Sequence, residues 1–399
     1  MKLLKILHTS DIHLDHVLTD YHRDCRDVRR AELVSAFDFL VDEAVRQAAD
    51  IMLIAGDLVC ARSVSDSTAS AVREGFRRLA RASIFAAVVP GEAEEAHSLA
   101  MLRQVCSEPN VHLFLGEEWS RVSPLAGVSV WGLRTTSRNS TTNALANLVV
   151  EGLGIHIGLM HGTFAGTPGL DSSISPVTPT ELSMSGLDYL ALGHYHNMVN
   201  NSVGRATCWY SGSPAHLGFD TRGERHALIV TVRGDGVRVY PMRVPGRPHR
   251  VVNVEVTAGR AREQLYARLA RLASSELCLR VEVEGETEPD DVGLLGRAEQ
   301  DFRSKFFHLA MEDHTTVCCP PWRSSDSRSA HLDEAFFRKA ARGAAESGAP
   351  RKPPGIIDRA LKLGLGALGG AYPCSSRDCC SGSGPRGGRS RLTWRRGYP

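Results

Sequence analysis

Short apolar runs alternate with longer segments of helical periodicity over the first 245 residues. The runs 3–7, 51–55 and 84–89 predict buried strands, since nearly every position is apolar. Between them, residues 28–48 and 68–81 carry apolar side chains at the spacing of a helix. Further strands are predicted at 128–131, 155–160, 189–192, 207–210, 227–232 and 237–240. This order is typical of an α/β domain whose later strands follow one another like a meander.

A second, smaller pattern begins near residue 251. Runs at 251–256, 277–283 and 306–311 predict strands with helices between them, in a βαβ-like order. We therefore expect domains at 1–245 and 246–318, then a linker with helical segments at 319–371 and a disordered Gly/Ser/Arg-rich tail at 372–399. The last predicted helix carries an apolar stripe that either packs onto the chain itself or docks a partner.

Composition narrows the class of protein. A chain of 399 residues with 42% hydrophobic and 23% charged residues is globular, and a net charge of +2 excludes a wholly basic nucleic-acid binder. Apolar runs stay shorter than the roughly 18–20 residues of a membrane helix, and the start is too short for a signal peptide. Ten scattered cysteines without a CxxC pair predict reduced thiols. We expect a cytoplasmic protein that does not contact a membrane.

The charge is unevenly distributed along the chain. From Tyr372 on, six arginines accompany a single aspartate, so the tail carries +5 and the remaining chain −3. Two arginine groups in the body, 23–30 and 73–81, are interleaved with acidic residues. A solvated helix face explains them better than a track of phosphate contacts.

Side chains that bind metals follow four of the predicted strands. Asp11 and His13 follow the first strand, Asp57 the second, and His161 and the pair His194 and His196 follow two later strands. Open α/β sheets build their sites at these carboxyl ends. Each motif alone is more often a turn or a buried histidine, but the ordered set favours a metal site. Mixed carboxylate and imidazole ligands suit Mn²⁺, Fe²⁺ or Zn²⁺ better than Ca²⁺.

These motifs resemble those of the calcineurin-like metallophosphoesterases and, within them, of the SbcD-type DNA repair exonucleases. The resemblance rests on residues 8–15 (HTSDIHLD), 54–58 (IAGDL), 160–162 (MHG), 188–196 (DYLALGHYH) and 210–214 (YSGSP). It covers residues 1–245 and, more weakly, 250–315. It implies a four-layer αββα sandwich with a small α+β capping domain.

The resemblance also implies two divalent metal ions, with Mn²⁺ expected and Fe²⁺, Zn²⁺ or Mg²⁺ as alternatives. Residue by residue, it assigns Asp11, His13 and His196 to the first ion, His161 and His194 to the second, and Asp57 to both. Two such ions clamp the attacking and leaving oxygens of a phosphoryl displacement. The implied partners are DNA, an SbcC-like coiled-coil ATPase subunit and a second copy of the chain.

The third motif departs from the family pattern. The family has Gly-Asn-His-Asp where this chain has Gly91-Glu92-Ala93-Glu94. Glu92 can still bind a metal ion, but it adds a negative charge. Ala93 cannot donate a proton, and losing a catalytic donor costs roughly 10²–10⁴-fold in rate. His97 is close in sequence, although a surface position on a helix explains it better, so no catalytic residue is assigned.

The sequence therefore predicts a dinuclear-metal phosphodiesterase that hydrolyses DNA, weakened by its third motif. Two alternatives stay open. One is a phosphoesterase for small phosphate esters, against which the capping-like domain argues. The other is a catalytically impaired DNA-binding or scaffold subunit, which Glu92 and Ala93 favour.

Overall fold

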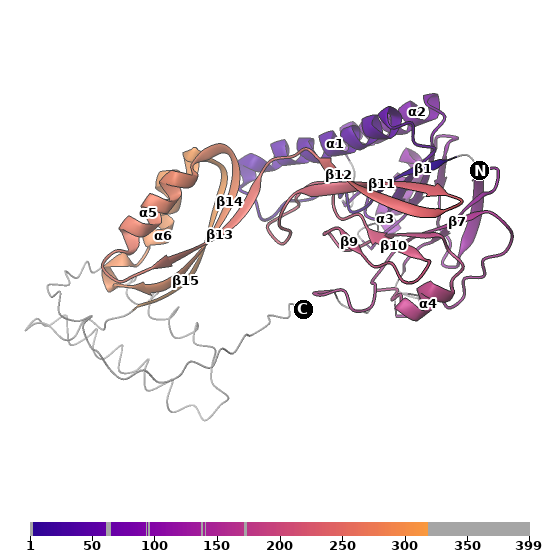
Figure 1. Ribbon diagram of the computed structural model, residues 1–399. Coiled ribbons are helices and arrows are strands. Elements are labelled where there is room, and N and C mark those ends of the chain that lie inside the picture. Colours follow the sequence, from indigo (N-terminus) through magenta and orange to yellow (C-terminus); the bar gives the residue numbers. More distant parts are fainter. Residues whose placement is uncertain are drawn as a thin grey trace, which may run out of the picture. The chain divides into compact units, whose positions relative to one another are not determined.

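The computed structural model describes residues 3–60, 65–92, 94, 96–136, 139, 141–170 and 174–317 (Figure 1). They divide into two compact units. Unit 1 contains the chain up to Val251 together with Ser274–Arg280 and Ser304–Leu309, and unit 2 contains Val252–Ala273, Val281–Arg303 and the described residues from Ala310 on. The expected linker, helical segments and basic tail at 319–399 lie outside the described residues. The domain boundaries themselves stay a prediction.

The first sheet of unit 1 has six strands, and four of them are parallel. Its order is β12 (Gly236–Val244), β11 (Arg225–Arg233), β1 (Leu4–Thr9), β2 (Ile51–Ala55), β3 (Phe85–Val89) and β4 (Val111–Leu113). Strands β1 to β4 pair in parallel, while β11 is antiparallel to both of its neighbours. The carboxyl ends of β1, β2 and β3 consequently meet at one edge.

The second sheet also has six strands. Its order is β5 (Ser120–Leu125), β6 (Val128–Leu133), β7 (Ile155–His161), β8 (Tyr189–Gly193), β10 (Thr207–Tyr210) and β9 (Val199–Asn200). Strands β6, β7, β8 and β10 are parallel, and the chain then crosses to the first sheet for β11. The expected meander is therefore wrong, because the connections between these strands are long enough for crossovers of a dozen or more residues.

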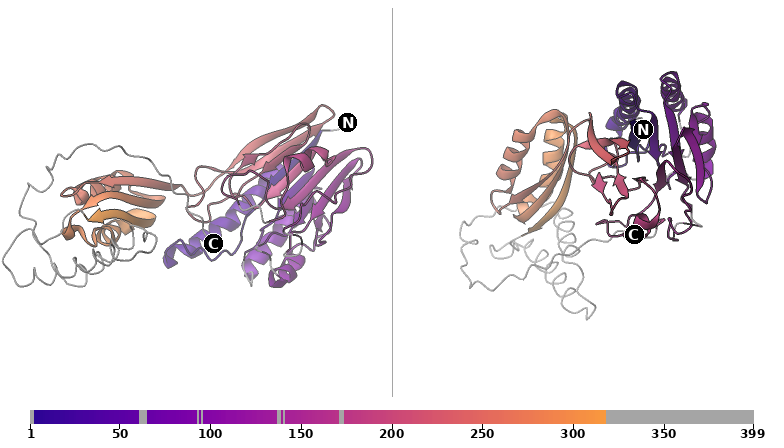
Figure 2. Two further views of the ribbon diagram at one scale, coloured as in Figure 1. Left: turned by 90° about the horizontal axis from the view of Figure 1, so that it is seen from below. Right: turned by 45° about the vertical axis from the view of Figure 1, so that its right-hand side comes forward.

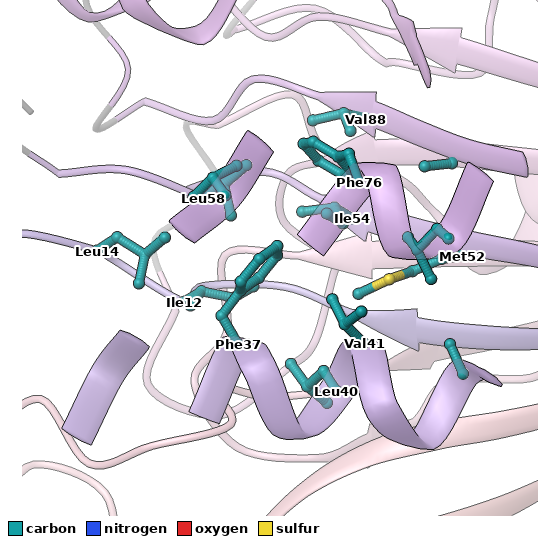
Figure 3. Packing of buried hydrophobic residues seen from close by; sticks show 14 of the residues in the cluster. Ile12, Leu14, Phe37, Leu40, Val41, Met52, Ile54, Leu58, Phe76 and Val88 are labelled. Atoms are coloured by element: carbon teal, nitrogen blue, oxygen red, sulfur yellow. The ribbon is translucent and has the colours of Figure 1, made fainter. Parts of the chain in front are cut away.

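Three helices belong to the first sheet's outer side: α1 (Arg23–Arg46), α2 (Asp66–Arg81) and α3 (Ala96–Val105). Phe37 and Leu40 of α1 pack with Met52 and Ile54 of β2 in one apolar cluster (Figure 3). Helices α1 and α2 also contact each other (Figure 2). The helix predicted at 28–48 begins earlier, at Arg23, because its first turns are rich in Arg and Asp rather than in apolar residues.

A second apolar cluster lies between the two sheets. Ile51 and Leu53 of β2 contribute to it, whereas Met52 and Ile54 face the helices. This alternation explains why the strand is apolar at every position. A third cluster covers the other face of the second sheet with α4 (Pro179–Met184) and residues 144–150. Two packed sheets between helical layers confirm the predicted α/β sandwich.

The third sheet has three strands in the order β13 (His249–Val256), β14 (Ser274–Thr287) and β15 (Phe306–Val317). The later part of β13 and β15 and the second half of β14 belong to unit 2. Helices α5 (Ala261–Leu272) and α6 (Leu294–Phe302) contact each other. Leu265 and Leu269, predicted on one helix face, are both buried. Within the described ranges, we find no helix long and apolar enough to cross a membrane.

Candidate metal centre

The strand ends bring the seven predicted metal-binding side chains into one cluster. Four of them, Asp11, His13, Asp57 and Glu92, follow β1, β2 and β3, and the other three, His161, His194 and His196, end or follow β7 and β8. Their ligand atoms form three overlapping groups, each within 4.8 Å: Asp11, His13 and His196; Glu92, His161 and His194; Asp11, Asp57 and His161. The cluster therefore lies where the carboxyl ends of both sheets meet.

Glycines let the two sheets approach each other here. A Cβ atom on Gly193 would lie 1.7 Å from the carbonyl oxygen of Ala55. One on Gly56, whose φ is +86°, would lie 2.1 Å from Nδ1 of His161. Any larger residue would push the second sheet's histidines away from the carboxylates of the first.

Backbone hydrogen bonds join the loop that follows β1 to the loop that follows β2. The N–H of Asp11 donates to the carbonyl of Gly56 at 3.0 Å, and that of His13 to the carbonyl of Asp57 at 2.9 Å. Asp11, His13 and Asp57 have φ between 51° and 52°, in the left-handed region. Such a conformation costs about 1–3 kcal/mol per residue and persists only where the surroundings enforce it. The hydrogen bonds between the two loops hold these residues in that conformation.

His161 shows that this donor set fits a cation. Its Nδ1 lies 3.0 Å from the carbonyl oxygen of Ala55, which can only accept, so Nδ1 carries the proton. The lone pair of the neutral ring is then on Nε2, which lies 3.0 Å from Oε2 of Glu92 and 3.8 Å from Oδ2 of Asp57. Two acceptors at this distance repel each other unless a positive charge lies between them. Both ring nitrogens of His13 are buried without a hydrogen-bond partner among the described residues.

In the absence of an ion, a proton on Nε2 of His161 supplies the positive charge between the ring and the carboxylates, and a bound cation would displace that proton. Burial lowers the pKa of His161, but the neighbouring carboxylates of Asp57 and Glu92 outweigh it and raise that pKa well above its usual value. Burial likewise raises the pKa of Asp11, yet His161 and His196 shift it downward overall. Buried acids and imidazoles at contact distance thus hold one another in their charged forms. Divalent cations satisfy the same carboxylates.

Glu94 supports the centre, and its role was not predicted from the sequence. Its Oε2 accepts from the N–H of Asp57 at 3.1 Å and from that of Gly91 at 2.7 Å, and its Oε1 accepts from Leu58 at 2.8 Å and Val59 at 3.1 Å. Burial and the charge of Asp57 raise its pKa to about 8. Glu94 therefore braces the loop that carries Asp57. An acid at the end of the third motif was the available signal.

Asp220 is a second supporting residue. Its Oδ2 lies 3.7 Å from Nδ1 of His196, which leaves Nε2 of that ring to face Asp11. Burial lowers the pKa of His196, and Asp220 and Asp11 reverse that shift and raise it. No motif of the sequence points to Asp220, because it lies in the irregular segment between β10 and β11.

Two predictions concern Ala93 of the altered third motif and His97, which follows it. Ala93 lies outside the described residues, as does the side chain of His97, whose backbone is in α3. The interpretation that Ala93 removes a proton donor and that His97 lies on a helix surface stays a prediction.

Comparison with known proteins agrees with the geometry. Residues 4–198 match the family model of the calcineurin-like phosphoesterases. This segment is a calcineurin-like phosphoesterase domain. The family supports a hydrolase, and together with the cluster it indicates a site for two divalent ions.

Individual relatives are distant. The chain is 25% identical over 305 residues to the uncharacterized metallophosphoesterase YhaO of Bacillus subtilis, covering 72% of this chain and 73% of that protein. The DNA double-strand break repair protein Mre11 of Methanosarcina mazei is 24% identical over 258 residues, covering 63% of this chain. The chain thus spans only 40% of the length of that Mre11.

Solved structures give weaker similarity. TT1561 of Thermus thermophilus has a TM-score of 0.38 at 15% identity, covering 60% of this chain and 99% of that chain. A dimetal phosphatase from Danio rerio has a TM-score of 0.37 at 10% identity, covering 61% of this chain and 99% of that chain.

Proposed function

We propose that this protein is a dinuclear-metal phosphodiesterase that hydrolyses phosphodiester bonds of DNA. The observation that carries the proposal is the convergence of three carboxylates and four histidines on one edge, with Nε2 of His161 lying 3.0 Å from Oε2 of Glu92. The choice of DNA is supported by the similarity to Mre11 of Methanosarcina mazei, which is named as a DNA double-strand break repair protein.

We assign Asp11, His13 and His196 to one ion, Glu92, His161 and His194 to the other, and Asp57 to both. Bound ions supply Lewis acidity and lower the pKa of water to near neutrality. The chain's own residues orient the donors, because the Ala55 carbonyl keeps the proton of His161 on Nδ1. We expect Mn²⁺ from the mixed ligand set, with Fe²⁺, Zn²⁺ or Mg²⁺ as alternatives.

The third motif sets the expected rate. With Glu92, three carboxylates face two divalent ions, which leaves a net charge of +1 where an asparagine would leave +2. A less positive centre attracts a phosphodiester less strongly and stabilises its transition state less. Ala93 supplies no proton to the leaving group. We therefore expect turnover reduced by roughly 10²–10⁴-fold relative to a site with the complete motif.

The test combines metal counting with substrate choice. The purified protein is loaded with Mn²⁺ and assayed on labelled single-stranded DNA, blunt duplex DNA, bis-p-nitrophenyl phosphate and p-nitrophenyl phosphate. We expect two ions per chain and cleavage of DNA and of the diester. Asp57→Asn should lose at least about 10³-fold in turnover. The matched control Asp235→Asn, on an exposed turn, should keep it. Hydrolysis of the monoester alone would identify an enzyme for small phosphate esters.

A second function is favoured by the altered motif itself. A chain with Glu92 and Ala93 fits a DNA-binding or scaffold subunit whose chemistry is impaired. Two bound ions and DNA affinity without cleavage of any substrate would establish this function and overturn the first one.

The expected partners are part of the same proposal. We propose an SbcC-like coiled-coil ATPase subunit, a homodimer and a cytoplasmic location. None of the five cysteines in the described ranges forms a disulfide, which supports a reducing compartment. Light scattering of the purified chain tests the dimer, and co-purification with the ATPase tests the complex.

A further inference from the structure

A second polar cavity lies in unit 1, and none of the seven residues of the metal centre lines it. Its volume is about 420 Å³, within the range of about 300–1,000 Å³ that is usual for ligand pockets. It is formed by α1, by the segment 215–225 that leads into β11, and by the segment 243–250 that joins β12 to β13. We call it the arginine pocket after five of its lining residues: Arg29, Arg225, Arg243, Arg247 and Arg250.

The arginine pocket has an excess of positive charge. Glu32 and Glu224 are the acidic residues that line it, against five arginines. Glu32 pairs with both Arg29 and Arg247, and Glu224 pairs with Arg243 at 3.1 Å. Among the described residues, no carboxylate forms an ion pair with Arg225 or Arg250. Five arginines against two lining glutamates leave a positive excess, which Glu276 beside Arg247 and the charge of Asp220 near Arg225 reduce without cancelling.

Arg225 is a buried arginine of this pocket, and hydrogen bonds hold its side chain in place. Its side chain is buried, with 7% of the residue's surface exposed. The guanidinium donates to the carbonyls of His196 at 3.0 Å and Glu224 at 3.2 Å, and to Oδ1 of Asn197 at 3.3 Å. A fourth hydrogen bond reaches the carbonyl of Arg222 at 3.5 Å, and all four acceptors are uncharged. The nearby charge of Asp220 offsets part of the cost of burying Arg225, and an anion in the pocket would offset more of it.

Arg29 adds a second buried arginine to the wall. It is 2% exposed, and its Nε has no hydrogen-bond partner among the described residues. The planar guanidinium presents paired N–H donors that match the oxygens of a phosphate group. Two buried and three partly exposed arginines in one cavity thus form an anion site rather than a solvated surface.

Arg225 also connects this pocket to the metal centre. The carbonyl that it holds belongs to His196, whose ring faces Asp11. A phosphate in the arginine pocket therefore lies beside the loop that carries a proposed metal ligand. This arrangement suits a substrate with several phosphates along a chain.

We propose that the arginine pocket binds a backbone phosphate of the nucleic-acid strand whose neighbouring phosphodiester is cut at the metal centre. The inference rests on the proposed function and names the subsite that holds the strand outside the reacting bond. Phosphate contacts position a strand without reading its sequence, so the subsite acts on any sequence.

The experiment uses a strand that binds without being cut. The Mn²⁺-loaded protein is titrated into a fluorescent phosphorothioate dT15, and anisotropy gives the affinity over a range of salt concentrations. The pocket variant is Arg243→Glu/Arg250→Glu, which changes two exposed arginines. The matched control is Arg205→Glu/Arg233→Glu, which makes the same charge change at two exposed arginines that do not line the pocket.

We expect the pocket variant to bind dT15 at least about tenfold more weakly and to lower the slope of log affinity against log salt by about 1 to 2. The control should change affinity less than threefold. Hydrolysis of bis-p-nitrophenyl phosphate should be the same in all three proteins, since this small diester does not reach the pocket.

The outcomes separate this inference from the proposed function. If no protein hydrolyses the diester but the pocket variant alone binds dT15 weakly, the subsite stands and the catalytic proposal falls. Equal affinity loss in both variants, or none in the pocket variant, overturns the subsite while leaving catalysis intact. Displacement of dT15 by inorganic phosphate or thymidine monophosphate at equal phosphate concentration would also overturn it, because the pocket would then hold a small anion rather than a strand.

Discussion

Unit 1 contains two buried groups of histidines with opposite surroundings. In the metal centre, the histidines lie among three carboxylates. The other group, the aromatic histidine cluster, consists of His216, His249 and His308. Its rings contact Tyr21 and Phe219, and His216 stacks on His249 at 4.2 Å. The same residue type is thus buried in two places for two different purposes.

The pKa values distinguish His161 of the metal centre from His216 of the aromatic histidine cluster. Burial and the positive charges of Arg225 and Arg29 lower the pKa of His216 to about 4. Burial also lowers the pKa of His161, but there the neighbouring carboxylates outweigh burial and raise the pKa. His13 resembles the first case, because burial outweighs Asp11 and lowers its pKa to about 3. Nearby carboxylates, rather than clustering of histidines, therefore identify a metal site.

The sharpest test exchanges one histidine in each group. His161→Gln should lower the bound metal from two ions to one or fewer and reduce turnover at least about 10³-fold, since the ring holds a ligand lone pair. His216→Gln should keep two ions, because its ring nitrogens contact Thr221 and the Gly223 carbonyl instead. Metal analysis of the two folded variants provides the measurement. Loss of metal from His216→Gln would remove the distinction between the groups.

Restoring the third motif should strengthen the metal centre. Glu92→Asn/Ala93→His lowers the negative charge and supplies an imidazole donor, so we expect about 10²-fold faster cleavage of bis-p-nitrophenyl phosphate. Glu92→Asn alone separates the charge effect from the donor effect. An unchanged rate in the double variant would show that the altered motif does not limit turnover.

The sequence predicted that these side chains lie together, because each follows the end of a strand. Asp11, Asp57 and His161 come directly after apolar runs, and parallel strands bring such ends together. The aromatic histidine cluster was not predicted, since His216 and His308 are nearly a hundred residues apart and stand in no recurring pattern. The arginine pocket was not predicted either. Arg29 was interpreted as part of a solvated helix face, yet it is buried.

The order of the strands in each sheet could not be predicted from the sequence either. The runs of β6, β7 and β8 are mostly apolar, which predicts burial but not parallel pairing. Which sheet receives β11 depends on packing between distant segments. Those contacts become visible only once both sheets are assembled.

Glu94 tests whether a carboxylate that accepts hydrogen bonds from backbone N–H groups holds the metal-binding loop in place. Glu94→Gln keeps one oxygen, so two of the four backbone N–H donors of this loop lose their acceptor. We expect the free energy of unfolding to fall by about 2–4 kcal/mol and metal affinity to fall about 10–100-fold. Urea denaturation and metal titration measure these effects, with Glu151→Gln on the exposed surface as the control. Wild-type metal affinity in Glu94→Gln would show that Asp57 does not depend on the brace.

The smallest effect concerns the aromatic histidine cluster itself. Burial and neighbouring positive groups lower the pKa of His308 to about 4. Since the unfolded chain then binds more protons below pH 6.5, the stabilisation present above that pH is lost as the pH falls from about 6.5 towards 4. The loss amounts to about 2 kcal/mol at pH 5 for one such histidine.

His308→Leu should remove this dependence. Nε2 of His308 has no hydrogen-bond partner among the described residues, and leucine fills a similar volume. We expect the variant to gain about 2 kcal/mol relative to the wild type on going from pH 7.5 to pH 5, as measured by urea denaturation at both pH values. Contributions from the metal centre cancel in this comparison because both proteins share it. An identical pH dependence would mean that His308 is already protonated in the folded state, and the contrast with the metal centre would then not extend to this residue.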